Sequence, residues 1–211
     1  DQTGPKPVID LTHKLGVTSD IPEQVSICLG AVEITVHDMV AAFSTFANKG
    51  IYIKPQIITR IEDKNGNLIF ETVPESHDVL NQDIAYAVIK LMEGVTESGT
   101  GTRLRWGGGG VKSYNYRFEN PIAGKTGTTQ NNSDGWFMGM VPNLCTGIWV
   151  GCEDRAARFR STAMGQGATM ALPIWGLYMD KCYKDDKLNV SKDPFERPEN
   201  LNIKVDCWKA T

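Results

Sequence analysis

The sequence predicts an α+β domain in which helices pack on an antiparallel sheet. Two segments carry the periodicity of amphipathic helices, β-branched segments flank turn signals, and helices and strands follow one another without the strict alternation of a parallel sheet. The chain has 211 residues with 41% hydrophobic content, which is enough to bury a core. Length therefore predicts one domain, or one and a fraction.

The first well-formed helix is predicted after Thr35. Residues 1–26 are rich in Pro, Thr, Asp and Gly, which favours irregular structure with one helical turn. Thr35 and Asp38 have the spacing of an N-terminal capping box, and apolar residues follow at helical spacing. We expect this helix to end at Gly50, since glycine favours the backbone conformation that follows a helix.

A β-hairpin is predicted next. Residues 51–61 and 67–73 carry β-branched residues and flank the dipeptide Asn65-Gly66. This dipeptide best fits a type I′ turn, in which both central residues have a positive φ.

A second amphipathic helix is predicted over residues 82–96, with Asn81 as its N-terminal cap. The sequence Gly-Thr-Gly-Thr at 99–102 breaks this helix, and we interpret it as a connector. Residues 103–120 contain four consecutive glycines at 107–110, which predicts a flexible excursion on the surface.

An antiparallel meander of three strands is predicted from residue 121 onwards. The strands cover residues 122–129, 136–141 and 146–152, and Pro142-Asn143 makes the tight connection between the last two. Pro121 begins the first strand. Proline suits an edge strand, because it has no N–H group to donate to a neighbouring strand.

A last helix is predicted over residues 170–183, where it should cover one face of the sheet, with Pro173 in its first turn. The helical period places four residues along one side: Ile174, Leu177, Tyr178 and Lys181. Residues 184–211 are polar and predict an extended appendage, which Phe195 or Trp208 could tether.

Composition and spacing exclude several kinds of function. A net charge of -3, from 22 Lys+Arg against 25 Asp+Glu, gives no basic surface for nucleic acid. The five cysteines form no CxxC pair and the three histidines are far apart, so we predict no metal and no cofactor. A phosphate-binding loop ending in Gly124-Lys125-Thr126 would need a glycine at position 119, where this chain has Glu119.

The most informative motif is Ala123-Gly124-Lys125-Thr126-Gly127-Thr128-Thr129. Side chains alternate along a strand, so Lys125 and Gly127 should face one way while Thr126 and Thr128 face the other. An edge strand offers backbone N–H and C=O groups to an extended peptide. Lys125 would supply positive charge, the threonine hydroxyls would bind a carboxylate, and Gly127 would allow close approach.

Seven segments carry a resemblance to a known family, in the same order along residues 15–182: 26–30, 33–35, 46–50 with Lys54-Pro55, 99–101, 123–129, 134–139 and 147–151. In these segments the chain resembles the class A penicillin-binding proteins, specifically the C-terminal part of their transpeptidase domain. The resemblance implies a partial fold of the penicillin-binding and β-lactamase type.

The resemblance also implies a function. In this family the Lys-Thr-Gly strand binds the D-Ala-D-Ala end of a peptidoglycan stem peptide, and β-lactams inhibit the reaction. Substrate binding would then fall to Lys125, Thr126, Gly127 and Thr128, with the backbone N–H of Thr128 as one donor of the oxyanion hole. The family works outside the bacterial inner membrane, to which an N-terminal segment anchors it.

The family's serine nucleophile is missing from these residues. It lies in a Ser-x-x-Lys motif, and none of the serines in this chain has a lysine three positions later. Ser113-Tyr114-Asn115 matches the family's Ser-x-Asn motif but lies only ten residues before Lys125, and we interpret it as a chance match.

We therefore expect residues 1–183 to be the C-terminal portion of a transpeptidase domain, inactive alone, and residues 184–211 to be an extension. The remainder of the domain would be its partner, and uncovered apolar surface should favour self-association. Two alternatives stay open: a peptide-binding or scaffold module without catalysis and, less well supported, a serine β-lactamase.

Overall fold

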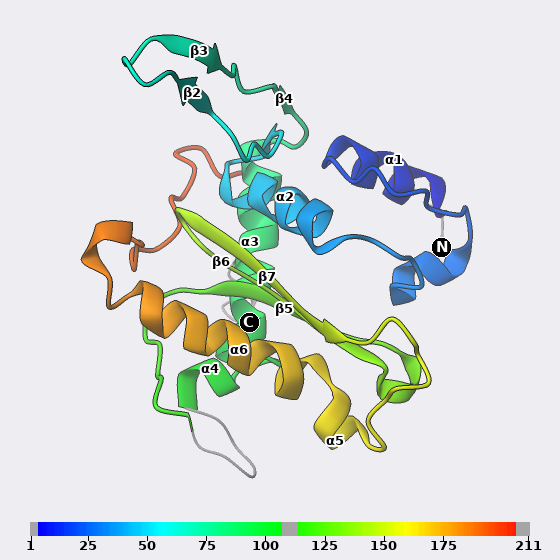
Figure 1. Ribbon diagram of the computed structural model, residues 1–211. Coiled ribbons are helices and arrows are strands. Elements are labelled where there is room, and N and C mark those ends of the chain that lie inside the picture. The colour runs from blue at the N-terminus through cyan, green and yellow to red at the C-terminus, as the bar shows by residue number, and fades with distance from the viewer. Residues whose placement is uncertain (1–3, 107–113, 206–211) are drawn as a thin grey trace.

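The computed structural model describes residues 4–106 and 114–205. Its centre is an antiparallel sheet of three strands in the order β5-β6-β7, formed by β5 (Ala123–Thr128), β6 (Asp134–Val141) and β7 (Leu144–Gly151). Helix α6 (Gly167–Cys182) covers one face. Helices α2 (Val36–Ala47) and α3 (Gln82–Glu97) cover the other face (Figure 1). The predicted α+β class and the predicted meander are confirmed.

The remaining elements lie around this three-layer centre. They are α1 (Lys6–Lys14), η1 (Val25–Leu29), β1 (Ile51–Ile53), β2 (Arg60–Glu62), β3 (Leu68–Glu71), β4 (Ser76–Asp78), α4 (Arg103–Trp106), η2 (Gln130–Asn132), α5 (Thr162–Gly165) and η3 (Asp186–Leu188). In the described part of the chain, no helix is long and apolar enough to span a membrane.

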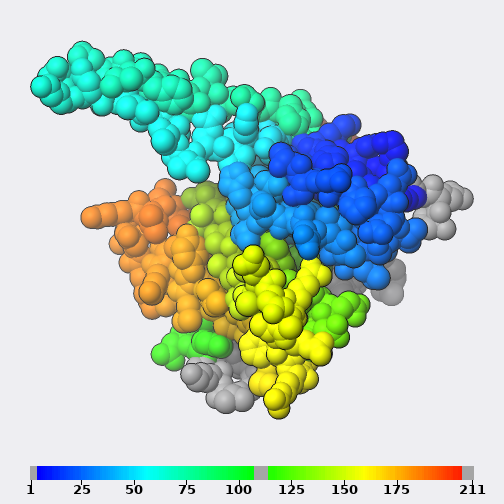
Figure 2. All heavy atoms as spheres, turned by 45° about the vertical axis from the view of Figure 1, so that its right-hand side comes forward, coloured from blue at the N-terminus to red at the C-terminus, as the bar shows by residue number. Residues whose placement is uncertain are grey.

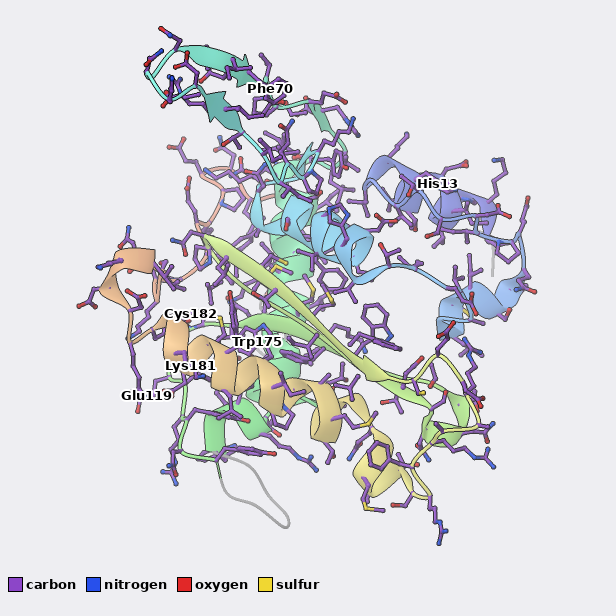
Figure 3. The ribbon with its side chains drawn as sticks, viewed as in Figure 1. His13, Phe70, Glu119, Trp175, Lys181 and Cys182 are labelled. Atoms are coloured by element: carbon purple, nitrogen blue, oxygen red, sulfur yellow. The ribbon has the colours of Figure 1, made fainter. Side chains whose placement is uncertain are left out.

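The sheet forms because its middle strand is buried on both faces. On one face, Phe137 and Val141 of β6 pack with Trp175 of α6, which is fully buried. Figure 3 shows Trp175 on the side of α6 that faces the sheet. On the other face, Met140 of β6 packs with Ile89 of α3. A strand covered on both faces needs apolar residues on both, and β6 has them.

Both predicted helix caps are confirmed. The side chain of Thr35 accepts a hydrogen bond from the Asp38 N–H at 3.0 Å, and α2 begins at the next residue. The side chain of Asn81 accepts one from the Asp83 N–H at 3.3 Å at the start of α3. Side-chain capping satisfies N–H groups that have no partner within the first turn.

The predicted hairpin exists, but its turn differs from the prediction. Gly66 has φ 83°, whereas Asn65 is absent from the residues with positive φ, so the turn is not type I′. The carboxylate of Asp63 accepts from the N–H groups of Asn65 at 2.7 Å and Asn67 at 2.9 Å. These bonds fix the turn around Asp63 and leave only Gly66 in the left-handed region.

The hairpin is also shorter than predicted. Only β2 and β3 pair directly across the turn, while β1 pairs with β4 farther down. In Figure 2 the hairpin projects from the body of the molecule.

Two predictions of irregular structure were wrong. Residues 6–14 form the helix α1, which buries Ile9 against Leu15 and Val17. Residues 103–106 form α4, and Tyr116 and Phe118 stack with ring centroids 5.3 Å apart inside the core. The burial of Tyr116 and Phe118 therefore packs residues 114–120 against the core, where a surface excursion was predicted. The four glycines at 107–110 and Ser113 lie outside the described residues.

The predicted features of α6 were correct in part. The helix begins at Gly167, so Pro173 lies in its interior and not in the first turn. The stripe of Ile174, Leu177 and Tyr178 lies on the outer side, where each residue is between 42% and 47% exposed. The buried side is instead formed by Leu172, Trp175, Met179 and Cys182.

The tail does not extend away from the molecule over its described length. Phe195 is buried with Ile89 and Met140, and Glu196 forms an ion pair with Lys49 at 2.8 Å. Tethering by Phe195 is confirmed, whereas Trp208 lies outside the described residues.

Candidate active site

The Lys-Thr-Gly motif forms β5, an outer strand of the sheet, as predicted from Pro121. Ala123 is buried against α3, and Ile122 is buried against Trp175 on the opposite face. Because side chains alternate, Lys125 and Gly127 lie on the α3 face and Thr126 and Thr128 lie on the α6 face. Lys125 and Thr128 are exposed, whereas Ala123 and Gly124 are buried.

The backbone of β5 presents hydrogen-bonding groups at its outer edge. The N–H of Thr129 donates to the carbonyl of Asp134 at 3.3 Å, which makes these two residues a hydrogen-bonded pair. Hydrogen-bonded and non-hydrogen-bonded pairs alternate along an antiparallel ladder. Thr128, opposite Gly135, is therefore a non-hydrogen-bonded pair, and its N–H and C=O point away from β6.

The same alternation turns the carbonyl of Thr126 towards the outer edge. The Lys125 ammonium confirms this direction, because its Nζ donates to the Thr126 carbonyl at 2.8 Å. A cation, an outward carbonyl and an outward N–H thus lie along one edge.

Two contacts hold the threonine side chains on the α6 face. The hydroxyls of Thr126 and Thr100 are 2.7 Å apart. The Thr128 hydroxyl accepts a hydrogen bond from the N–H of Gly167 at 3.1 Å, so the first residue of α6 is bonded directly to the motif strand. Each threonine therefore contacts a different segment of the chain.

Arg105 of α4 holds the segment that leads into β5. Its Nη1 donates to the carbonyls of Phe118 at 2.9 Å and Asn120 at 2.5 Å, and its Nη2 donates to the Thr96 hydroxyl at 3.1 Å. Thr96 in turn donates to the carbonyl of Ile122 at 2.6 Å. Burial lowers the pKa of the Arg105 guanidinium, yet it keeps its charge at neutral pH.

Lys125 does not line either of two hollows that the described residues form. A cavity of about 110 Å³ is lined by Phe46, Tyr86 and Phe195, and an open hollow of about 580 Å³ by Ile51, Asp78 and Leu80. Both adjoin Lys49, and Lys125 lines neither. Within the described ranges, no cluster of three His, Cys, Asp or Glu residues is arranged to hold a metal.

The sequence prediction missed Thr100 and Gly167. Thr100 lies in the Gly-Thr-Gly-Thr turn that we interpreted as a connector, and Gly167 precedes the predicted start of the last helix. Local patterns carried no signal for either contact, since both join segments at least 26 residues apart. For Thr100 the available signs were the repeated Gly-Thr spacing and the place of residues 99–101 among the segments that resemble the family.

Comparison with known proteins identifies the class to which this fold and this strand belong. Residues 16–150 match the family model described as penicillin binding protein transpeptidase domain. The chain belongs to this family, and the resemblance deduced from its motifs is confirmed.

The particular relatives are of the 1A type. Penicillin-binding protein 1A of Aquifex aeolicus is 30% identical over 208 residues, which cover 97% of this chain and 26% of that protein. The protein of the same name from Neisseria flavescens is 32% identical over 191 residues, covering 87% and 21%. This chain thus spans about a quarter of the length of these curated relatives.

Solved structures show the same fold. The penicillin-binding protein PonA1 from Mycobacterium tuberculosis superposes with a TM-score of 0.74 at 26% identity, over 93% of this chain and 53% of that one. PonA1 has also been solved in complex with penicillin V, with a TM-score of 0.73. Penicillin-binding protein 1A from Haemophilus influenzae has a TM-score of 0.72 at 20% identity, which supports the fold alone.

Proposed function

We propose that this chain supplies the substrate-holding and oxyanion-stabilising side of a D-Ala-D-Ala transpeptidase site. The observation that carries the proposal is the outward backbone N–H of Thr128, next to the Lys125 ammonium on the outer edge of β5. A donor fixed in a sheet costs no reorganisation when negative charge develops on a carbonyl oxygen, and such a donor is worth about 3 kcal/mol.

The proposed substrate is the stem peptide of peptidoglycan, bound as an extra strand along β5. Backbone pairing at an edge strand would set the register, and Gly127 would let the peptide approach closely. The terminal carboxylate would lie near the Lys125 ammonium and the hydroxyls of Thr126 and Thr128. This arrangement would place the carbonyl of the scissile bond against the Thr128 N–H.

The proposed reaction is acyl transfer through a serine outside these 211 residues. The serine oxygen forms a bond to the carbonyl carbon, the peptide C–N bond breaks, and the released D-Ala amine takes a proton. An amine of a second stem peptide then attacks the ester and releases the serine. β-lactams would acylate the same serine, consistent with the penicillin V complex of PonA1.

We also propose how the chain is organised. Residues 1–183 would be the C-terminal portion of the transpeptidase domain and residues 184–211 an extension, which packs against the domain through Phe195. The remainder of the domain would cover the exposed apolar stripe of α6, and the isolated chain would self-associate there. The assembled protein would act on the outer side of the inner membrane.

Labelling with a fluorescent penicillin tests this proposal. The complete polypeptide that carries this chain should be labelled on the serine of a Ser-x-x-Lys motif, whereas residues 1–211 alone should take up no label. Lys125→Ala in the complete polypeptide should slow labelling, and Lys49→Ala, a distant lysine, should not.

Three results would contradict the proposal. Label on a serine within residues 1–211 would show a nucleophile that the motif search missed. Absence of label from the complete polypeptide would favour the scaffold alternative. Rapid hydrolysis of the bound penicillin would instead favour the β-lactamase alternative.

A further inference from the structure

The hydroxyls of Thr100 and Thr126 meet beside β5, the strand along which the substrate is proposed to bind. Their oxygens are 2.7 Å apart and join the turn after α3 to the motif strand. We propose that Thr100 is a positioning residue that aims the Thr126 hydroxyl at the substrate carboxylate. This inference rests on the proposed function, and it assigns part of the site's preference for a free carboxylate to Thr100.

The turn that carries Thr100 is held on two sides. The N–H of Gly101 donates to the carbonyl of Val95 at 2.8 Å. Arg103, two residues on, donates through Nη1 to the carbonyl of Ala168 at 3.0 Å and to the Thr169 hydroxyl at 2.7 Å. The turn is therefore hydrogen-bonded to α3 through Gly101, and the residue that follows it, Arg103, is hydrogen-bonded to α6.

The glycines beside Thr100 allow this close packing. A Cβ atom at Gly99 would come within 2.9 Å of the Val95 Cα, and one at Gly101 would come within 3.1 Å of the Val95 carbonyl oxygen. Real Cβ atoms rarely or never come so near. Gly99 and Gly101 therefore allow the turn to pack closely against the end of α3. Thr100, between them, is the residue whose side chain contacts Thr126.

The number of hydroxyl protons determines which threonine donates in the bond between Thr100 and Thr126. Each hydroxyl has one proton to donate. When the Thr126 proton is donated to a carboxylate, the contact of 2.7 Å can be satisfied only if Thr100 donates to the Thr126 oxygen. Such a chain polarises the Thr126 hydroxyl and strengthens its bond to an anion.

The hydroxyl of Thr128, also on the α6 face of β5, is held in a different way. Thr128 accepts from the backbone N–H of Gly167, so its oxygen is held by the main chain. Thr126 is thus the hydroxyl whose orientation depends on another side chain. Loss of this orientation should weaken the hydrogen bond from Thr126 to a charged carboxylate more than its bond to a neutral ester, because hydrogen bonds to charged groups are the stronger ones.

The test compares acylation of the complete polypeptide by benzylpenicillin and by its methyl ester. Thr100→Val keeps the shape of the side chain and removes the hydroxyl. It should slow acylation by benzylpenicillin by about tenfold, while acylation by the ester should change by less than about twofold. Thr100→Ser restores a hydroxyl and should recover most of the rate. Thr126→Val combined with Thr100→Val should be no slower than Thr126→Val alone.

Thr102→Val is the matched control, since Thr102 lies in the same turn. The acylation rate of this variant should equal that of the unaltered protein. Equal losses for the acid and the ester, or no loss for either, would overturn the role of Thr100. If the unaltered polypeptide reacts with neither compound, the proposed function itself fails. Melting curves of each variant distinguish loss of recognition from loss of fold.

Discussion

At the scale of single residues, Gly167 shows how closely the chain builds its proposed site. Its N–H donates to the Thr128 hydroxyl, and a Cβ atom there would lie closer than 3.0 Å to the carbonyl oxygens of Gly127 and Trp136. These are backbone atoms of β5 and β6, which cannot move aside as a flexible side chain can. Only glycine lets α6 begin directly on the motif strand.

Gly167→Ala should therefore destabilise the protein by about 1–3 kcal/mol, because the added methyl overpacks backbone against backbone. Gly94→Ala is the control, since a Cβ atom at Gly94 in α3 meets nothing within 4 Å. That change should stabilise the protein by up to about 1 kcal/mol, because alanine favours a helix over glycine. Urea unfolding of both variants measures the two effects, and equal stabilities would refute the close packing of α6 on β5.

At the scale of elements, the β2–β3 hairpin differs from every strand of the central sheet. Ile61, Leu68 and Phe70 are each between 42% and 51% exposed. On the same hairpin, Arg60 pairs with Glu71 at 3.1 Å. Figure 3 shows Phe70 on the projecting hairpin, away from the sheet. An isolated two-stranded ribbon is only marginally stable, so the hairpin should contribute little to the stability of the domain.

Two phenylalanine truncations test this separation. Phe70→Ala should lower the free energy of unfolding by about 1 kcal/mol or less, since it loses only cross-strand contacts. Phe137→Ala, the same chemical change at a fully buried side chain of β6, should cost about 3–5 kcal/mol. Chemical denaturation followed by tryptophan fluorescence gives both values. A large loss for Phe70→Ala would mean that the hairpin packs on the body.

Elements whose signals are local were predictable from the sequence. Thr35 and Asn81 cap their helices through bonds to residues two or three positions away, and the meander has short connections. Elements fixed by distant partners were not. Phe118, for example, packs edge to face against Trp175, which is 57 positions later in the sequence. The turn at Asn65-Gly66 is a local feature that was predicted wrongly, because the Asp63 carboxylate binds the N–H groups of Asn65 and Asn67.

The candidate site divides in the same way. The alternation of Lys125 and Thr126 about β5 follows from the period of any strand, and the edge position follows from Pro121. The partners of the threonine side chains depend on how α3 and α6 are placed in space. Sequence therefore predicted the motif strand, whereas Thr100 and Gly167 required the structure.

At the scale of the whole molecule, the described residues would provide one side of the proposed site. The sheet is covered by α6 on one face and by α2 and α3 on the other, and β5 remains at the outer edge with Lys125 exposed. This arrangement supports a division of labour in which a rigid strand holds the substrate and a serine on another segment reacts with it. We propose that the Thr128 N–H, fixed by the sheet, stabilises the oxyanion.

The most direct test of this claim removes that N–H alone. Thr128→Pro deletes the donor at a position whose N–H points away from β6, where proline is tolerated in an edge strand. Thr128→Val is the control, since it keeps the N–H and loses only the hydroxyl bonded to Gly167. Melting curves establish whether both variants fold, and an amide-to-ester replacement at residue 128 serves if the proline variant does not.

The measured quantity is the acylation rate of the complete polypeptide by benzylpenicillin. The account predicts that Thr128→Pro is slower by about 100-fold or more, the effect of losing one oxyanion donor, while Thr128→Val stays within about tenfold of the unaltered protein. A folded proline or ester variant that reacts as fast as the valine variant would contradict it.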